Sequence, residues 1–219
     1  MARKLVNGTV PAIGSVFGTT TNITALTNAA NAVATFAAGH AIVVGDFVQI
    51  MASGWGGVEG RVFRASAVAT NDITLEGFNT SSTTLYPAGG GVGSGRRITT
   101  WQSITQVNAD GLTVDGGEQQ FLDGQYIDTS LAFRVPTNKS PIGLQMVLDD
   151  DQTMTQWTPI RAAEVAVSNF PVRLAYPGGG FAVGSGIWTI SSAPALTGNN
   201  VQKRTLNVAL ASIFSEYTT

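Results

Sequence analysis

Three acidic residues, Glu118, Asp123 and Asp128, come closest in this chain to a catalytic arrangement. Two carboxylates that flank a glycosidic bond are the machinery of glycoside hydrolysis, because one acts as the acid and the other as base or nucleophile. The sequence does not fix the separation of these side chains, and a polar surface loop supplies such residues equally well. We therefore expect a solvated loop here rather than an active site.

The run GGGVGSGRR at residues 89–97 has the glycine content of a phosphate-binding loop. A Walker loop requires Gly-Lys-Ser/Thr ahead of a helix, so that the lysine reaches the phosphates and the hydroxyl reaches magnesium. Here Arg96 follows the last glycine, and a predicted strand follows the arginines. We interpret the run as part of a flexible linker over residues 79–97.

Thiolate chemistry and histidine-pair metal sites lack the residues that they require. The chain has no cysteine and only one histidine, His40, so neither a thiolate site nor a histidine pair can form. The acidic run Asp149-Asp150-Asp151 begins like a calcium loop, but Met154 stands where that loop needs glycine. We predict no metal, no cofactor and no catalytic residue.

Four tryptophans, at positions 55, 101, 157 and 188, are the remaining candidates for a binding surface. Exposed aromatic rings can form a platform that holds sugars, so a carbohydrate-binding β-sandwich module is one hypothesis. These tryptophans are scattered over a turn, two strands and a helix, and aromatic residues make up only 8% of the chain. Core packing explains at least three of them, so this hypothesis is the weakest that we keep.

The composition indicates a protein whose surface carries few charges. Asp, Glu, Lys and Arg make up 12% of the residues, about half of the usual share. Either neighbouring subunits cover much of the surface or the exterior is rich in Ser, Thr and Gly, and we weigh the two equally. A net charge of −2 argues against binding nucleic acid through phosphate contacts, but it does not exclude a protein past which DNA slides without binding.

Targeting and membrane-spanning segments are not expected. The N-terminus has two basic residues with no apolar run after them, so we predict no signal peptide. No stretch approaches the ~18 apolar residues of a membrane span. We expect a protein that is made in a cytoplasm and stays soluble.

The elements that position these residues are mostly strands. Gly45-Asp46, between two apolar runs, predicts a tight hairpin over residues 41–51. Residues 110–130 are polar, acidic and rich in glycine, which predicts a long loop or a protruding hairpin. Residues 22–35 show no clear period. Further strands are expected at residues 10–20, 58–68, 73–78, 98–107, 131–135 and 142–148.

The C-terminal part has the clearest pattern, a helix and then three strands over residues 169–214. Apolar residues recur every three or four positions from Trp157 to Val167. Two helix starts are possible: the acidic run at residues 149–151 suits a helix N-terminus electrostatically, whereas Thr158-Pro159 suits an N-cap followed by the first helical position. We therefore expect a helix at least over residues 159–165. In the strands, apolar residues alternate with polar or small ones, at Val172, Leu174 and Tyr176 and again at Leu206, Val208 and Leu210.

From residue 98 onward the order of elements resembles the tail tube proteins of long-tailed, non-contractile bacteriophages, the class that includes the lambda tail tube protein. The matching pieces are the strand ITTWQSITQV, the polar loop DGLTVDGGEQQFLDGQYIDTS, the strand IGLQMVLDDD, the helix around WTPIRAAEVA, and the closing segments NFPVRLAYPGG, GSGIWTISSAP and VQKRTLNVALASI. Gly178 replaces the acidic or amide residue of the family's strand ending. VPAIGSVFGTT corresponds to the family's first strand.

The resemblance implies a mainly β fold, a β-sandwich or split barrel with one flanking α-helix, together with a small inserted all-β subdomain. The expected organisation is an N-terminal arm and first strand at 1–21, the insert with its glycine-rich linker at 22–97, and the tail-tube sandwich at 98–219. The insert departs from the family pattern, and we expect it on the outside of the tube or between subunits.

By this resemblance the protein is a structural virion protein that forms hexameric rings, and the rings stack into the tube through which DNA is ejected. The long loop then packs against the adjacent ring through Asp115, Glu118, Asp123, Tyr126 and Asp128. Alternatively, its four carboxylates line a weakly acidic lumen that repels DNA phosphates.

The implied partners are further copies of this chain, the tape measure protein and viral DNA without specific binding, and tail terminator and tail tip proteins. No membrane is involved; the protein resides in the virion tail and is assembled in the host bacterial cytoplasm. A tail terminator or head-completion protein, which uses the same fold in a single ring, is the alternative within this class.

Overall fold

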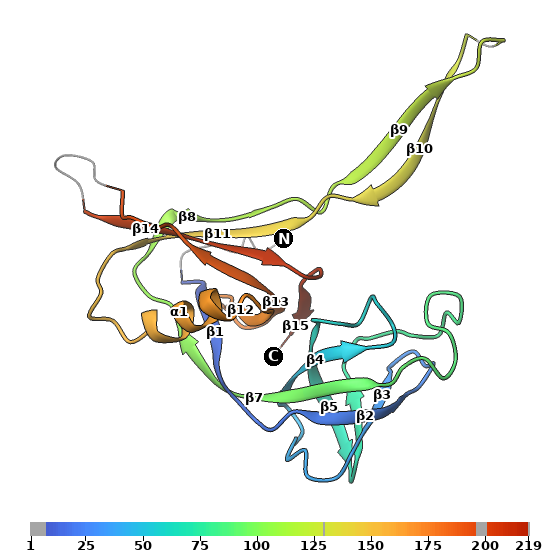
Figure 1. Cartoon of the computed structure of the whole chain (residues 1–219), viewed down its shortest axis with the longest axis horizontal. Coiled ribbons are helices and arrows are strands. Elements are labelled where there is room, and N and C mark those ends of the chain that lie inside the picture. Colours follow the sequence, from blue (N-terminus) through green and yellow to red (C-terminus); the bar gives the residue numbers. More distant parts are fainter. Residues whose placement is uncertain (1–7, 129, 196–200, 219) are drawn as a thin grey trace.

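The computed structural model describes residues 8–128, 130–195 and 201–218, so residues 1–7 of the expected N-terminal arm lie outside the description. The described chain is mainly β, as predicted, with fifteen strands and one helix. Two bodies adjoin each other, and a long two-stranded arm projects from one of them (Figure 1). The elements are β1 (Val10–Phe17), β2 (Thr21–Leu26), β3 (Val33–Phe36), β4 (Phe47–Ser53), β5 (Val62–Ala69), β6 (Asp72–Leu75), β7 (Gly93–Ser103), β8 (Val107–Asp115), β9 (Gln119–Gln125), β10 (Ala132–Lys139), β11 (Ile142–Asp149), α1 (Trp157–Ala166), β12 (Phe170–Ala175), β13 (Phe181–Ile190), β14 (Lys203–Leu210) and β15 (Ser215–Tyr217).

The first body is a closed barrel of six strands in the order β2-β3-β6-β5-β4-β7, which the pairing of β2 with β7 closes. Alternate residues of its short strands point inward, so that β3 and β6 each bury every second side chain. The largest of the fully buried side chains inside it are Phe36, Ile50, Phe63, Ile73 and Leu75. Closure leaves the barrel without open strand edges, which limits unwanted pairing with other chains.

The second body, which we call the sandwich, consists of β1, β12, β13, β14, β11 and β8, paired in that order, with α1 packed on β13 and β1. Strand β11 buries Leu144, Met146 and Leu148 on one face, where they meet Trp188 of β13 and Ile160 of α1. The helix buries Trp157, Ile160 and Ala163, which recur at helical spacing. The helix therefore covers one face of this sheet. On the opposite face the start of β13 packs against the barrel through Phe181, Val183 and Ser185, whereas the central residues of β14 and β11 are exposed there.

Strand β7 belongs to both bodies. Its first half pairs with β2 and β4 of the barrel, and its second half, from Ile98 onward, pairs with β1 of the sandwich. The expected boundary between residues 97 and 98 falls inside this continuous strand. The barrel is thus joined to the sandwich by an unbroken β-ladder rather than by a linker alone.

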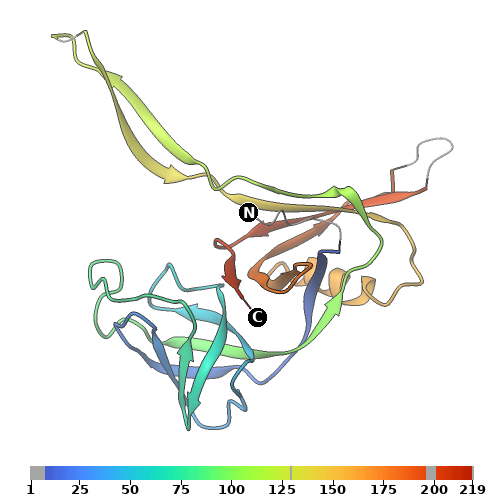
Figure 2. The same ribbon diagram turned by 180° about the vertical axis from the view of Figure 1, so that it is seen from behind.

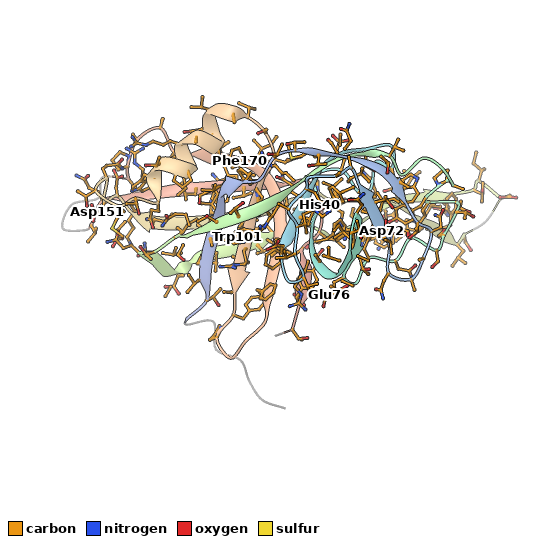
Figure 3. The ribbon with its side chains drawn as sticks, turned by 90° about the horizontal axis from the view of Figure 1, so that it is seen from below. His40, Asp72, Glu76, Trp101, Asp151 and Phe170 are labelled. Atoms are coloured by element: carbon orange, nitrogen blue, oxygen red, sulfur yellow. The ribbon has the colours of Figure 1, made fainter. Side chains whose placement is uncertain are left out.

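Aromatic side chains fill the joint between the two bodies. The ring of Phe47 makes edge-to-face contacts with Trp101, centroids 5.6 Å apart, and with Phe181, 5.3 Å apart. Gln49 Nε2 donates a hydrogen bond of 2.7 Å to the carbonyl oxygen of Asn169 across the same joint. Figure 3 shows Trp101 near the middle of the molecule, where barrel and sandwich meet.

Two local predictions in the barrel region are wrong. Residues 41–46 form no strand, because Asp46 Oδ2 accepts the N–H of Val43 at 2.7 Å and so folds this segment into a turn, and the first strand here begins at Phe47. The expected linker already becomes strand at Gly93. A Cβ at Gly93 would collide with the carbonyl oxygen of Ala52, so this glycine serves close strand packing.

The C-terminal predictions are confirmed for the described residues, with one correction. The helix spans Trp157–Ala166, and three strands follow in which Leu206 and Val208 are buried as expected. Thr158 is not the N-cap: Gln156 occupies that position, and its side-chain oxygen instead accepts the N–H of Thr105 at 2.7 Å. A contact with a distant strand therefore sets the start of the helix. Residues 196–200 lie outside the description.

Candidate assembly interface

The arm is a two-stranded ribbon of β9 and β10 that continues the strands β8 and β11 beyond the body. Of the loop and hairpin alternatives for residues 110–130, the hairpin is therefore confirmed. The ribbon bends at Gly116 and Gly117, which have φ of 87° and 80°. A Cβ at Gly116 would collide with the carbonyl oxygen of Pro141, so the bend requires glycine. Across the bend, Glu118 and Ser140 stay joined, because the Ser140 N–H donates to the Glu118 carbonyl at 2.9 Å.

One face of the ribbon is apolar. Residues paired across a strand ladder share a face, so Leu122 lies beside Val135, and Phe133 lies over Gly124. The ring of Phe133 stacks on Tyr126 with centroids 4.9 Å apart. Tyr126, Phe133, Leu122 and Val135 form this face, which we call the apolar arm face.

The opposite face combines an ion pair with the exposed ring of Phe121. Arg134 donates to the carboxylate of Asp123 at 2.6 Å, and its guanidinium lies 5.2 Å from the centre of the Phe121 ring. The hydrogen bond from Arg134 holds the pKa of Asp123 below its usual value. Because both side chains are exposed to solvent, the ion pair adds little to stability and mainly fixes the geometry of this face.

The apolar arm face has no cover within the described chain. Leu122 is 62% exposed, Tyr126 65% and Val135 46%. Figures 1 and 2 both show the ribbon standing clear of barrel and sandwich. An isolated two-stranded ribbon is marginally stable in water, and a contiguous exposed apolar patch marks an interaction site. The face is thus a candidate surface for contact with another protein chain.

The predicted loop residues are spread along the arm rather than brought together. Asp115 ends β8 opposite Gly143, Glu118 lies at the bend, and Asp123 lies in β9. Asp128 lies in the exposed turn at the tip. The carboxylates are thus distributed along the ribbon, and Asp123 is bound by Arg134, an arrangement that does not favour a glycosidase pair.

Three residues of the apolar arm face were not among the predicted site residues. Phe133 and Val135 alternate with Arg134 in a segment that was predicted as a strand, and this alternation was the available signal. Leu122 could be assigned to the same face only with the register between β9 and β10, which the sequence did not supply.

The other candidates for chemistry have structural roles. His40 donates from Nε2 to the carbonyl of Thr70 at 2.9 Å and accepts the N–H of Ile42 at Nδ1, so its ring stabilises a barrel loop. Figure 3 shows His40, Asp72 and Glu76 on the barrel and Asp151 at the far side of the sandwich. Across the described ranges no cluster of His, Cys, Asp and Glu suits a metal ion, and no helix has the length and apolarity to span a bilayer.

The tryptophans form no exposed platform. Trp55, Trp157 and Trp188 are at most 3% exposed, and Trp101 packs in the joint. The indole N–H of Trp55 donates to the carbonyl of Pro87 at 2.9 Å, which is an internal contact of the barrel. Core packing therefore accounts for these residues, as the sequence predicted for at least three of them.

Comparison with protein families gives a match that covers most of the chain. A family model described as phage tail tube protein, TTP, matches residues 53–219. The matched segment is more than half of the chain and includes the arm, the helix, strands β12–β15 and much of the barrel. A search of curated proteins returned no match.

Proposed function

The chain belongs to the phage tail tube protein family, and on this premise we propose that it is the ring-forming subunit of a siphophage tail tube. Family membership makes it a structural protein of the virion tail that assembles with other tail proteins into a multi-subunit tube. The finer proposal is that six copies form each ring, that the rings stack, and that DNA is ejected through the lumen.

The observation that carries this proposal is the uncovered apolar arm face. The ribbon points away from its own body in both views, so the described part of the chain leaves this face without cover (Figures 1 and 2). A second copy of the chain in the adjacent ring is the cover that we propose. The predicted inter-ring residues, Asp115, Glu118, Asp123, Tyr126 and Asp128, line this arm, and Leu122, Phe133 and Val135 supply its apolar contact.

Strand β8 supports lateral assembly within a ring. It is the last strand of the sandwich sheet, paired on one side only with β11 among the described strands. An unpaired edge invites a strand from another chain. Pairing between neighbouring subunits would satisfy this edge and would bury surface that carries few charges.

In this role the protein is a passive conduit without catalysis or cofactor. The tape measure protein and viral DNA occupy the lumen without specific binding, and terminator and tip proteins contact the two ends of the tube. Assembly takes place in the host cytoplasm. The barrel formed by β2–β7 lies on the outside of the tube or between subunits.

Negative-stain microscopy of the purified chain tests the proposal. We expect tubes of uniform diameter from the parent chain. We expect none from a Leu122→Asp variant, because a carboxylate on the apolar arm face would be buried between rings. Gln125→Asp, on the opposite face of the ribbon, is the matched control and should form tubes.

Three other results of this experiment would each contradict a different part of the proposal. A parent chain that stays monomeric at high concentration, even with tail initiator proteins present, contradicts the proposed function. Normal tubes from the Leu122→Asp variant contradict the role of the arm alone. Single rings that never stack favour the tail terminator or head-completion alternative.

A further inference from the structure

A second uncovered apolar surface lies on the outer side of α1. Ala162, Val165 and Ala166 are exposed and share one side of the helix, because residues three and four positions apart lie one above the other. Val165 is 82% exposed, and Val167, which ends the helix with φ of 45°, is 69% exposed. The described chain leaves this side without cover, as it leaves the apolar arm face, so it is a second candidate contact surface.

A groove adjoins this side of α1. It has a volume of about 300 Å³, and its lining includes Arg161, Glu164 and Val165 of the helix and Ile190, Ser191 and Arg204 of the sheet. Its walls are held together, because Glu164 Oε1 accepts the N–H of Ile190 at 3.1 Å and Arg204 donates to the Ser191 carbonyl at 3.0 Å. The volume is at the lower limit of small-molecule pockets (~300–1,000 Å³), so the groove suits a protruding side chain. We call the groove together with Ala162, Val165, Ala166 and Val167 the helix site.

The helix site lies at the end of the sandwich that is opposite to the arm. Strand β11 begins beside the arm, where Gly143 pairs with Asp115, and it ends beside the groove, where Leu148 pairs with Arg204. Figures 1 and 2 both show α1 and the arm toward opposite ends of the molecule. Subunits that stack in one direction bring opposite ends into contact, and such a heterologous contact continues without closing. Stacking therefore brings the arm of one subunit toward the helix site of the next.

The tip of the arm carries side chains that complement the helix site. Ile127 is fully exposed there, and an apolar side chain of this kind matches the exposed Val165. Asp128 is exposed as well and forms no ion pair within the described ranges. Arg161 donates to the neutral amide of Gln152 and likewise has no carboxylate partner among the described residues. Each surface thus offers an apolar side chain next to a charge of the opposite sign.

We propose that the helix site of one subunit receives the arm tip of a subunit in the adjacent ring. Ile127 packs on Val165 beside the groove, and the carboxylate of Asp128 pairs with the guanidinium of Arg161. This inference rests on the proposed tube function and adds to it the surface that the arm contacts. The apolar contact supplies most of the stabilisation, whereas the ion pair at the rim mainly sets orientation and register.

Cross-linking of assembled tubes tests the inference, because the chain has no cysteine of its own. The Ile127→Cys/Val165→Cys chain carries one thiol at the arm tip and one at the helix site. The reagent is a short bifunctional maleimide, which tolerates more variation in distance than a disulfide does. We expect a ladder of products on a denaturing gel that extends beyond six chains, because contacts between rings link an open series of subunits. The Ile127→Cys/Thr83→Cys chain, with its second thiol in an exposed barrel loop, is the control and should give no ladder.

Charge exchange tests the same contact without cysteines. We expect Asp128→Arg and Arg161→Asp each to raise several-fold the protein concentration at which tubes form, because each leaves two charges of the same sign at the contact. The Asp128→Arg/Arg161→Asp chain should restore the parent value. Circular dichroism of the subunits checks that all three variants are folded.

The remaining outcomes separate this inference from the proposed function. A ladder that stops at six chains overturns the inference, because the tip then contacts a subunit of its own ring. Tubes without cross-links, or with cross-links only in the Thr83→Cys control, overturn it too, and so does a double charge variant that assembles no better than the single variants. If the cysteine chain forms no tubes, the charge exchange decides. Failure of the parent chain to form tubes refutes the tube function itself and removes the basis of the inference.

Discussion

The hydroxyl of Tyr217 accepts a hydrogen bond of 3.1 Å from the backbone N–H of Arg64. Tyr217 belongs to β15, which pairs with β13 of the sandwich, whereas Arg64 belongs to β5 of the barrel. The last strand thus makes a second connection between the two bodies, in addition to the shared strand β7. The guanidinium of Arg64 also lies over the Tyr217 ring, 5.0 Å from its centre.

Removal of this hydroxyl should weaken the joint. We expect Tyr217→Phe to lower the free energy of unfolding by about 1–2 kcal/mol, because a partly buried N–H loses its acceptor while the ring contacts stay. Urea denaturation measures this change. Tyr176→Phe, which removes a half-buried hydroxyl from the turn after β12, is the control, and an equal loss in both variants would contradict the special role of Tyr217.

Stability at high pH should depend on the same residue. Burial raises the pKa of Tyr217 above its ordinary value of about 10. The folded chain therefore holds this proton at pH values where the unfolded chain has lost it, so the stabilisation is complete below pH ~10 and is lost as pH rises through the folded pKa. We expect the free energy of unfolding to fall above pH ~10, and to fall less steeply in Tyr217→Phe. Parallel pH profiles for the two chains would be inconsistent with this account.

Gln49 should be essential to the joint although it is polar. Its side chain is fully buried; it donates to the Asn169 carbonyl and accepts from Arg96 Nε at 3.0 Å. We expect Gln49→Leu to cost about 1–3 kcal/mol, because both partners would stay buried without it. Gln202→Leu, at an exposed position, should change the free energy of unfolding by less than about 0.5 kcal/mol. Thermal and urea unfolding of both variants check the difference.

Local pattern was sufficient to predict the sandwich strands and the helix. Leu206 and Val208 alternate with Asn207, and burial follows this alternation in β14. The helix stripe was equally local, but its start was not, because Gln156 binds Thr105 from a distant part of the chain. The sequence pattern thus predicts which segments form these strands and the helix, whereas contacts between distant residues determine where the helix begins.

The closure of the barrel and the composition of the apolar arm face depend on which strands pair and in which register. The sequence pattern alone does not show this pairing. Strand β2 has no clear period because a register shift between Ile23 and Ala25 interrupts the alternation, so that the buried residues are Ile23 and Leu26. The acidic residues of the arm were visible, whereas the apolar arm face depends on the register that sets Leu122 beside Val135. A one-residue change of register would place these side chains on opposite faces.

The stacked rings of the arm should depend on Gly124. A Cβ at this position would lie 2.5 Å from the Phe133 ring, so Gly124→Ala must displace the ring from its stack on Tyr126. We expect tube formation to decrease while the free energy of unfolding stays within about 0.5 kcal/mol of the parent, because the arm lies outside both cores. Sedimentation and microscopy measure assembly. Gly57→Ala, where a Cβ meets no atom within 4 Å, is the control.

The continuity of β7 also restricts how this protein can change in size. The half of β7 from Ile98 to Ser103 forms the pairing surface for β1, and the other half closes the barrel on β2 and β4. A deletion that removed the barrel together with all of β7 would leave β1 with an open edge and the sandwich with one strand fewer. A shortened chain must therefore end its deletion before Ile98, so the barrel is separable at a point within a strand and not at a loop.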